Sequence, residues 1–312
     1  MTTTKSSARR SRNTERTDVY TRVTDRIIEQ LSQGVKPWLK PWNAEHAAGR
    51  ITRPLRHNGE PYHGINILML WDSAETQGFS CPLWLTYKQA QQLGGHVKKG
   101  EKSSPVVYAS SFQKAEENDD GQEVQRDVHF LKEYRVFNAE QCDGLPERFS
   151  ETVQPSNNDI ERIAAAEQFV RHTGADVREG GNSACYVNGA DFIRMPRLET
   201  FRDAESHAAT LTHELVHWTK APSRLDRDFG RKTFGDEGYS REELVAELGS
   251  AFLCADLNVT PEVRDDHASY IDHWLQILKG DKRAIFSAAS FASKAVDYLH
   301  SLQRQDASAV DA

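Results

Sequence analysis

The motif H-E-x-x-H at residues 213–217 restricts the possible fold more than any other stretch of this chain. Its two histidines, His213 and His217, are four residues apart. On an α-helix both imidazoles therefore project from one face and can reach a single metal ion at about 2.0 to 2.1 Å. The flanking residues are small or apolar, which predicts a buried helix. Because a tetrahedral catalytic zinc site takes three protein ligands, the fold has to bring another ligand against this face.

The stretch "SREELVAELGSAFLCADLN" at residues 240–258 is the predicted source of that ligand. Ser240 and Glu243 have the spacing of a capping box, which predicts a helix that begins there. Glu243 and Glu247 share one helical face, and only one of them needs to bind metal. The pattern resembles that of Glu-zincin peptidases, which implies Glu243 as the ligand and Glu247 as an acid that accepts a hydrogen bond from a ligand histidine. The reverse assignment stays open, and helix geometry predicts that Glu242 points elsewhere.

Glu214 directly follows the first histidine, so its carboxylate is expected beside the open position of the metal. There it can act as a general base toward a water whose pKa zinc lowers to about 7. The predicted ion is Zn²⁺, and Co²⁺ or Mn²⁺ fit the same donors. Peptide hydrolysis also needs a strand edge for the substrate, for which residues 184–193 are the candidate. It further needs a transition-state donor, for which Tyr186, Tyr239 and His267 are unranked candidates.

Charge is distributed unevenly along the chain, although the total is -7 at pH 7. Residues 1–108 carry a net charge of +7, residues 109–148 carry -5, and residues 149–312 carry -9. A basic first third indicates contact with a polyanion. Single-stranded nucleic acid is bound by cations together with stacking rings, and this region contains both. The predicted single-stranded-DNA contacts are Trp38, Trp42, Arg53, Arg56, Tyr62, Lys98, Lys99 and Lys102.

The tryptophans of this region have a second interpretation as core residues, which we favour for Trp71 and Trp84 because both lie on apolar segments. The segments "KPWLKPW" and "HNGEPYHGIN" are instead expected to be exposed, since proline and glycine interrupt regular structure there. Reading of a double helix is not predicted, because no helix-turn-helix or zinc-finger spacing is found.

Six segments in order resemble the ArdC family of plasmid antirestriction proteins, from about residue 18 onward. They are "IIEQLSQGVKPWLKPW", "GEPYHGINILML", "WLTYKQAQQLGGHVKKGEKSSPVVY", "ACYVNGADFIRMP", "TLTHELVHWT" and "EELVAELGSAFLCADL". The resemblance implies an N-terminal single-stranded-DNA-binding domain and a C-terminal zincin-like metallopeptidase domain. His213, His217, Glu243 and Glu214 match the family pattern. The family commonly continues with Thr-Gly after the motif, whereas Lys220 follows Thr219 here.

The resemblance also implies a role in which incoming conjugative DNA escapes host restriction endonucleases. A restriction endonuclease or another protein substrate is therefore an expected partner beside single-stranded DNA. The alternative is a non-catalytic protein in which the metal is structural and protection comes from coating DNA or blocking a nuclease.

The fold class predicted from these observations is α+β, with two domains. The predicted parts are a disordered basic arm (1–17), a mixed α+β single-stranded-DNA-binding domain (18–145), a linker (146–157), a mainly helical zincin-like metallopeptidase domain with a small edge sheet (158–305) and a disordered tail (306–312). No apolar run reaches the ~18 residues of a membrane span, and the N-terminus lacks the apolar block of a secretory signal. Four cysteines without C-x-x-C spacing are expected to be reduced, so we expect a cytoplasmic protein.

Overall fold

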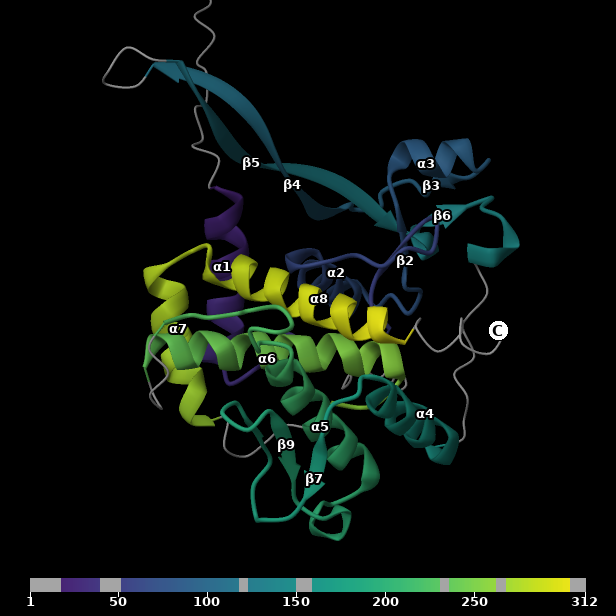
Figure 1. Ribbon diagram of the computed structural model, residues 1–312. Coiled ribbons are helices and arrows are strands. Elements are labelled where there is room, and N and C mark those ends of the chain that lie inside the picture. The colour runs from purple at the N-terminus through teal and green to yellow at the C-terminus, as the bar shows by residue number, and fades with distance from the viewer. Residues whose placement is uncertain are drawn as a thin grey trace, which may run out of the picture.

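The computed structural model describes residues 18–39, 52–117, 123–149, 159–230, 236–261 and 268–303. It contains a body of packed helices from which a long β-hairpin extends (Figure 1), and a small separate sheet lies at the opposite end. The predicted α+β class is thereby confirmed. The predicted basic arm and tail, most of the predicted linker, Trp42 and His267 lie outside the described residues.

The helices of the N-terminal half follow from clear local signals. They are α1 (Val19–Ser32), α2 (Ile65–Gln77) and α3 (Tyr87–Gln92). The carboxylate of Asp18 caps α1 by accepting the backbone N–H of Tyr20 at 3.1 Å. Gly78 ends α2 in the left-handed conformation, at φ 76°, which glycine adopts at little cost. Thr86 and Gln89 form a reciprocal capping box at the start of α3.

The main sheet contains the extended hairpin. Its strands, in sheet order, are β1 (Leu55–Arg56), β2 (Leu83–Leu85), β5 (Glu123–Asn138) and β4 (Ser104–Glu117). Strands β4 and β5 pair antiparallel over their whole length, from Ser104 opposite Val136 to Glu117 opposite Glu123. A second small sheet pairs β3 (His96–Val97) with β6 (Cys142–Asp143).

The C-terminal half is mainly helical, as predicted. Its helices are α4 (Asp159–His172), α5 (Ala204–Trp218), α6 (Glu237–Leu257), α7 (Ala268–Gly280) and α8 (Ala284–Leu302). Its sheet has the order β7 (Val177–Glu179), β9 (Phe192–Met195) and β8 (Cys185–Val187), with β8 at an edge. The predicted start of α6 at Ser240 is wrong by about one turn. The carboxylate of Asp236 caps the helix by accepting the backbone N–H of Tyr239 at 2.8 Å.

The two halves share one hydrophobic core, because one cluster of buried side chains runs through both. Helix α1 packs against α7, and α2 packs against α8. Trp38 meets Trp274 edge-on, with ring centroids 5.7 Å apart, and Trp71 meets Phe252 at 5.8 Å. The core interpretation of Trp71 is therefore correct, and Trp84 is also buried. A split between two independently packed domains is not seen in the described residues.

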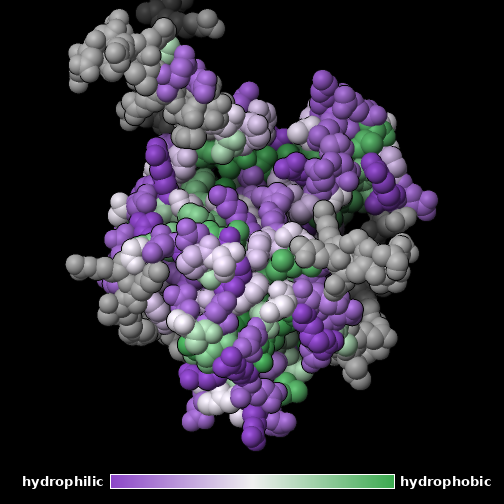
Figure 2. All heavy atoms as spheres, viewed as in Figure 1, coloured by the Kyte–Doolittle hydropathy of each residue, from purple (hydrophilic) through white to green (hydrophobic). Residues whose placement is uncertain are grey.

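On the side that Figure 2 presents, hydrophilic residues predominate and hydrophobic residues form scattered patches. None of the described helices combines the length and apolar character that crossing a membrane requires.

Candidate metal centre

Helix α5 carries the H-E-x-x-H motif into the centre of the molecule. Its N-terminus is held by Asp203, whose carboxylate accepts the backbone N–H of Ser206 at 2.8 Å. From Ala208 onward every residue of α5 is buried. The helix packs along α6, which is also buried over most of its length. Two buried helices in contact thus carry the motif and the predicted acids, which is the arrangement that the motif requires.

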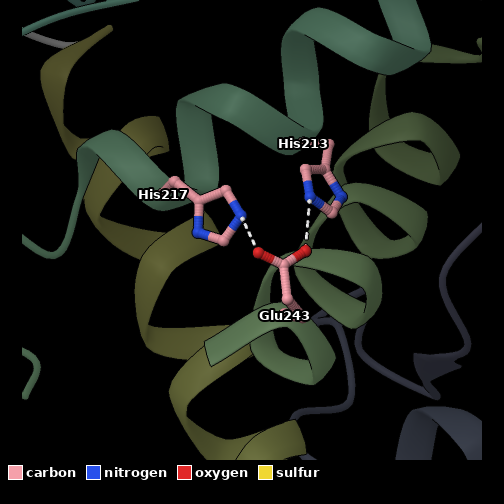
Figure 3. A group of neighbouring side chains, drawn as sticks. All are labelled: His213, His217 and Glu243. Atoms are coloured by element: carbon pink, nitrogen blue, oxygen red, sulfur yellow. Dashed lines mark ion pairs between the residues drawn. The ribbon is translucent and has the colours of Figure 1, made fainter. Parts of the chain in front are cut away.

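The two motif histidines face one carboxylate. His213 and His217 project from α5 toward Glu243 of α6, which lies between them (Figure 3). Glu243 Oε2 lies 3.5 Å from His213 Nε2, and Glu243 Oε1 lies 3.4 Å from His217 Nε2. One ligand atom from each of the three residues can be chosen so that all lie within 4.8 Å of one another. The three side chains are at most 10% exposed.

This donor set fits a divalent metal ion. Two imidazole nitrogens and a carboxylate oxygen are common ligands of catalytic zinc and of related divalent ions, with distances to the ion of about 2.0 to 2.2 Å. An ion between donors that lie within 4.8 Å of one another meets those distances after small side-chain movements. Glu247 is not part of this group, so the geometry favours Glu243 as the third ligand.

Glu242 contacts His217 at Nδ1, the ring nitrogen that does not face Glu243. The prediction that Glu242 points elsewhere is therefore wrong. Glu242 Oε1 lies 3.0 Å from His217 Nδ1. The same carboxylate accepts from Arg227 Nε at 2.8 Å and from Arg227 Nη2 at 2.9 Å. Arg227 is itself buried and donates to the carbonyl of Val216 at 3.0 Å. A carboxylate on the outer nitrogen of a ligand histidine fixes its ring orientation and tautomer, so Glu242 is suited to hold His217.

Glu247 lies on the corresponding side of His213. Its Oε2 is 3.8 Å from His213 Nδ1, which is within ion-pair reach but too long for a hydrogen bond. Its Oε1 accepts from Lys36 Nζ at 2.9 Å and from Trp38 Nε1 at 3.2 Å. Each motif histidine therefore turns Nε2 toward Glu243 and Nδ1 toward a different acid of α6.

The electrostatics of the site reflect burial and close pairing. Burial lowers the pKa of His213. Burial also acts to lower the pKa of His217, but Glu243 and Glu242 outweigh it and raise that pKa to about 9. Despite burial, the two histidines hold the pKa of Glu243 well below its ordinary value, and Arg227 and His217 lower that of Glu242 to about 2. A metal ion therefore competes with a proton at His217 and meets an ionised Glu243.

Glu214 connects the motif to the small sheet. It is 3% exposed, and its Oε2 accepts the backbone N–H of Tyr186 at 2.8 Å. Tyr186 lies on β8, the edge strand that was predicted at residues 184–193. The predicted general base thus lies within one hydrogen bond of the strand edge that a peptide could join.

Two of the three candidate transition-state donors are described, and the hydroxyl of each has partners. The Tyr186 hydroxyl donates to Asp191 Oδ1 at 2.8 Å and accepts from Arg224 Nη2 at 3.1 Å, and the Tyr239 hydroxyl lies 3.0 Å from that of Tyr270. Tyr239 lies one turn before Glu243 on α6. Burial, with the charge of Glu243 beside it, raises the pKa of Tyr239.

Three predicted DNA contacts are core residues instead. Trp38 is 0% exposed and packs against Trp274, so its ring cannot stack on a base. Arg53 is buried, and its Nε donates to Asp256 Oδ1 at 2.6 Å. Tyr62 is also buried, and the Arg56 guanidinium lies 5.7 Å from its ring centroid. The described part of the segment that was expected to be exposed, residues 36–39, is buried.

The other described members of the predicted set are exposed. They are Arg56, Lys98, Lys99 and Lys102. Sequence reasoning missed a pair of rings on the hairpin, Tyr108 and Tyr134, which are 56% and 41% exposed. Their centroids are 6.4 Å apart, and Lys132 Nζ lies 5.1 Å from the Tyr134 ring. Alternation along β4 and β5 was the signal that could have identified them, because residues two apart lie on one face of a strand.

Two protein-family models match the chain. One, the N-terminal domain of anti-restriction factor ArdC, matches residues 17–137. The other, a zincin-like metallopeptidase, matches residues 164–291. The two matches divide the chain into the two domains predicted from sequence, although both contribute to one core.

Solved structures and curated proteins are similar over most of the chain. The metal-free crystal structure of the antirestriction protein ArdC from plasmid R388 has a TM-score of 0.76 and 43% identity, covering 91% of this chain and 97% of that one. Its Mn(II)-bound structure has a TM-score of 0.73 and 42% identity, covering 92% and 99%. Protein y4eC of Sinorhizobium fredii (strain NBRC 101917 / NGR234) is 40% identical over 267 residues, 83% of this chain and 84% of that protein. The DNA primase TraC of Escherichia coli is 36% identical over 262 residues, which are 79% of this chain and 24% of the primase.

Proposed function

The chain belongs to the ArdC family of antirestriction proteins, and from this premise we propose that it protects incoming conjugative DNA from host restriction endonucleases. In this proposal the N-terminal half binds single-stranded DNA, and the C-terminal half is a zinc-dependent peptidase. The observation that carries the proposal is the buried group of His213, His217 and Glu243 with Glu214 beside the edge strand.

The residues of the site have distinct roles in this proposal. His213, His217 and Glu243 hold the ion, for which Zn²⁺ is the first candidate and Mn²⁺ or Co²⁺ are accepted by the same donors. When bound, the ion supplies a Lewis acid and lowers the pKa of a coordinated water. Glu214 takes a proton from the attacking water and returns it to the leaving amine. Tyr239, beside Glu243, and Tyr186, on the edge strand, are the described candidates for a hydrogen bond to the developing oxyanion.

A peptide substrate is proposed to add to the sheet at β8. That strand has an unpaired edge in the described sheet, and backbone hydrogen bonds to such an edge are a common way of binding an extended chain. The Tyr186 N–H that Glu214 now accepts is part of this edge. Substrate that pairs with Tyr186 would release the Glu214 carboxylate for its role as a base.

DNA binding is proposed for the outer face of the hairpin and the basic turn before it. Tyr108 and Tyr134 supply exposed rings on which bases can stack, while Lys132, Lys99 and Lys102 supply charge. These groups combine ring and cation in the way that sequence-independent binding of single strands requires. We expect Tyr108→Ala and Tyr134→Ala each to weaken binding of an oligothymidylate by about 1 to 3 kcal/mol per lost stack. Equal binding of duplex and single strand would contradict this assignment.

The test of the whole proposal is transfer of unmodified plasmid DNA into a restricting host. Glu214→Gln removes the base but keeps the size and the hydrogen-bond acceptor of the side chain. Lost protection by this variant, with metal content and thermal unfolding unchanged, would support hydrolysis as the activity. Full protection would favour the alternative, a non-catalytic protein with a structural metal that coats DNA or blocks a nuclease.

A further inference from the structure

Two residues of the N-terminal half, Lys36 and Trp38, contact an acid that lies beside the proposed metal centre. Lys36 and Trp38 follow α1, and both donate to Glu247 Oε1, at 2.9 and 3.2 Å. The Lys36 side chain is 6% exposed, and Trp38 is 0% exposed. The other oxygen of Glu247 lies 3.8 Å from His213 Nδ1. A chain of contacts therefore connects the N-terminal half to a proposed metal ligand.

This chain of contacts has a counterpart on the other histidine. His217 Nδ1 faces Glu242, and the buried Arg227 holds Glu242 with two hydrogen bonds. In both cases an acid of α6 lies near the Nδ1 atom of a motif histidine. A buried cation from another part of the chain forms a hydrogen bond to that acid. The two cations differ in origin, since Arg227 belongs to the loop after α5 and Lys36 to the segment after α1.

We propose that Lys36 and Trp38 are positioning residues of the metal centre, acting through Glu247 on His213. The Glu247 oxygen 3.8 Å from His213 Nδ1 is too far for a hydrogen bond, but its negative charge favours the ring form that carries the proton on Nδ1 and leaves the Nε2 lone pair for the ion. Lys36 and Trp38 fix the carboxylate in the direction of His213 by occupying its other oxygen. The inference rests on the proposed metal site. It adds that two residues of the N-terminal half help to orient one of the proposed ligands.

Lys36 and Trp38 are held in place by contacts with Trp274 of α7. The Trp38 ring meets Trp274 at 5.7 Å, and Lys36 Nζ lies 5.8 Å from the Trp274 ring. Trp274 in turn donates to the backbone carbonyl of Ser240 on α6 at 3.1 Å. The N-terminal segment is thus fixed to the helix that carries Glu247. Carboxylates that orient ligand histidines change metal affinity by about 10- to 100-fold when they are lost.

The experiment measures Zn²⁺ affinity of the full chain by competition with a chromophoric chelator. Lys36→Met should lower the affinity about 10- to 100-fold, because the orientation of Glu247 is lost. Trp38→Phe keeps the ring and removes only the N–H, so it should lower the affinity by less. Lys36→Arg should recover most of the affinity, because a guanidinium can donate to the same oxygen.

The matched control is Arg53→Met, which breaks a different buried ion pair between the same two halves, with Asp256. It should lower thermal stability as Lys36→Met does, yet leave Zn²⁺ affinity unchanged. Equal affinities of Lys36→Met, Trp38→Phe and wild type would overturn the inference, and so would an equal loss in Arg53→Met. A wild-type chain that binds no Zn²⁺ would overturn the proposed metal site and this inference with it.

Discussion

Gly249 of α6 lies against Val216 of α5, and a single methyl group added at Gly249 tests how closely these two helices pack. A Cβ added at Gly249 would lie 2.8 and 2.9 Å from the two methyl carbons of Val216, the residue before His217. Ordinary contacts of this kind begin near 3.4 Å. Val216 is β-branched and fully buried, so rotation of its side chain cannot remove both overlaps.

Two opposing terms set the effect of Gly249→Ala on the free energy of unfolding. Overpacking of a buried contact costs about 1 to 3 kcal/mol. Replacing glycine by alanine inside a helix stabilises by about 1 kcal/mol. We therefore expect a net loss of about 1 kcal/mol, accompanied by weaker Zn²⁺ binding because α5 moves away from α6. Gly280→Ala, at the last residue of α7, is the control for a methyl group without overlap, since nothing lies within 4 Å of a Cβ there, and its gain should be smaller than that of an interior position.

Urea denaturation of the metal-free chain measures these changes, and Val216→Ala completes a double-mutant cycle. In the Val216→Ala background, Gly249→Ala should stabilise by about 1 kcal/mol because the overlap is gone, which corresponds to a coupling of about 2 kcal/mol. If Gly249→Ala stabilises the otherwise unchanged chain as Gly280→Ala does, the helices are not in the contact described here.

Other substitutions test separate features of the molecule. Arg227→Met removes the cation that holds both oxygens of buried Glu242 and leaves Lys220 Nζ at 3.9 Å, so it should cost up to about 3 kcal/mol in urea denaturation, whereas Arg227→Lys should cost less. Asp203→Ala removes the cap of α5 and should lower the free energy of unfolding by about 1 kcal/mol, with Asp203→Asn close to wild type. Burial opposes ionisation of Asp297, but the hydrogen bond and charge of His63 hold its pKa below the ordinary value. Its contribution to stability should thus be present above the unfolded pKa, about 3.9, and be lost as pH falls through the lower folded pKa. Melting temperatures between pH 5 and 2 should fall less steeply for Asp297→Asn; an unchanged slope would show that another carboxylate is responsible.

The proposed metal ligands could be predicted in part from spacing, because each lies on a long helix with a fixed period, whereas the choice of Glu243 over Glu247 came from the resemblance to Glu-zincins. His213 and His217 are one turn apart, and Glu243 lies on a second apolar helix that had to pack somewhere in the core. The helical period also led to one wrong prediction, that Glu242 points away from the site. Nδ1 of His217 faces Glu242 and Nδ1 of His213 faces Glu247, so acids on two faces of α6 contact the histidines.

Residues outside regular elements could not be predicted in the same way. Arg227 lies in a loop with no periodicity, and its long-range partner is known only once the chain is folded. Prolines in the segment around Trp38 led to the expectation that it is exposed, but residues 37–39 form a turn and are buried, because local conformation does not determine burial. Arg53 was interpreted as a surface cation for the same reason, because its partner Asp256 lies far along the chain.

The contact between Lys36 and Glu247 also concerns the order in which the protein is made. These residues are 211 positions apart. At about 5 to 20 residues per second, roughly 10 to 40 s of synthesis separate them, during which the lysine has no carboxylate to meet. A nascent chain that stops soon after His217 would carry the complete five-residue motif but neither Glu243 nor Glu247. Metal held by such a fragment would lack Glu243 and the contact of Lys36 with Glu247, so assembly of the proposed centre requires that the chain through Glu247 has left the ribosome.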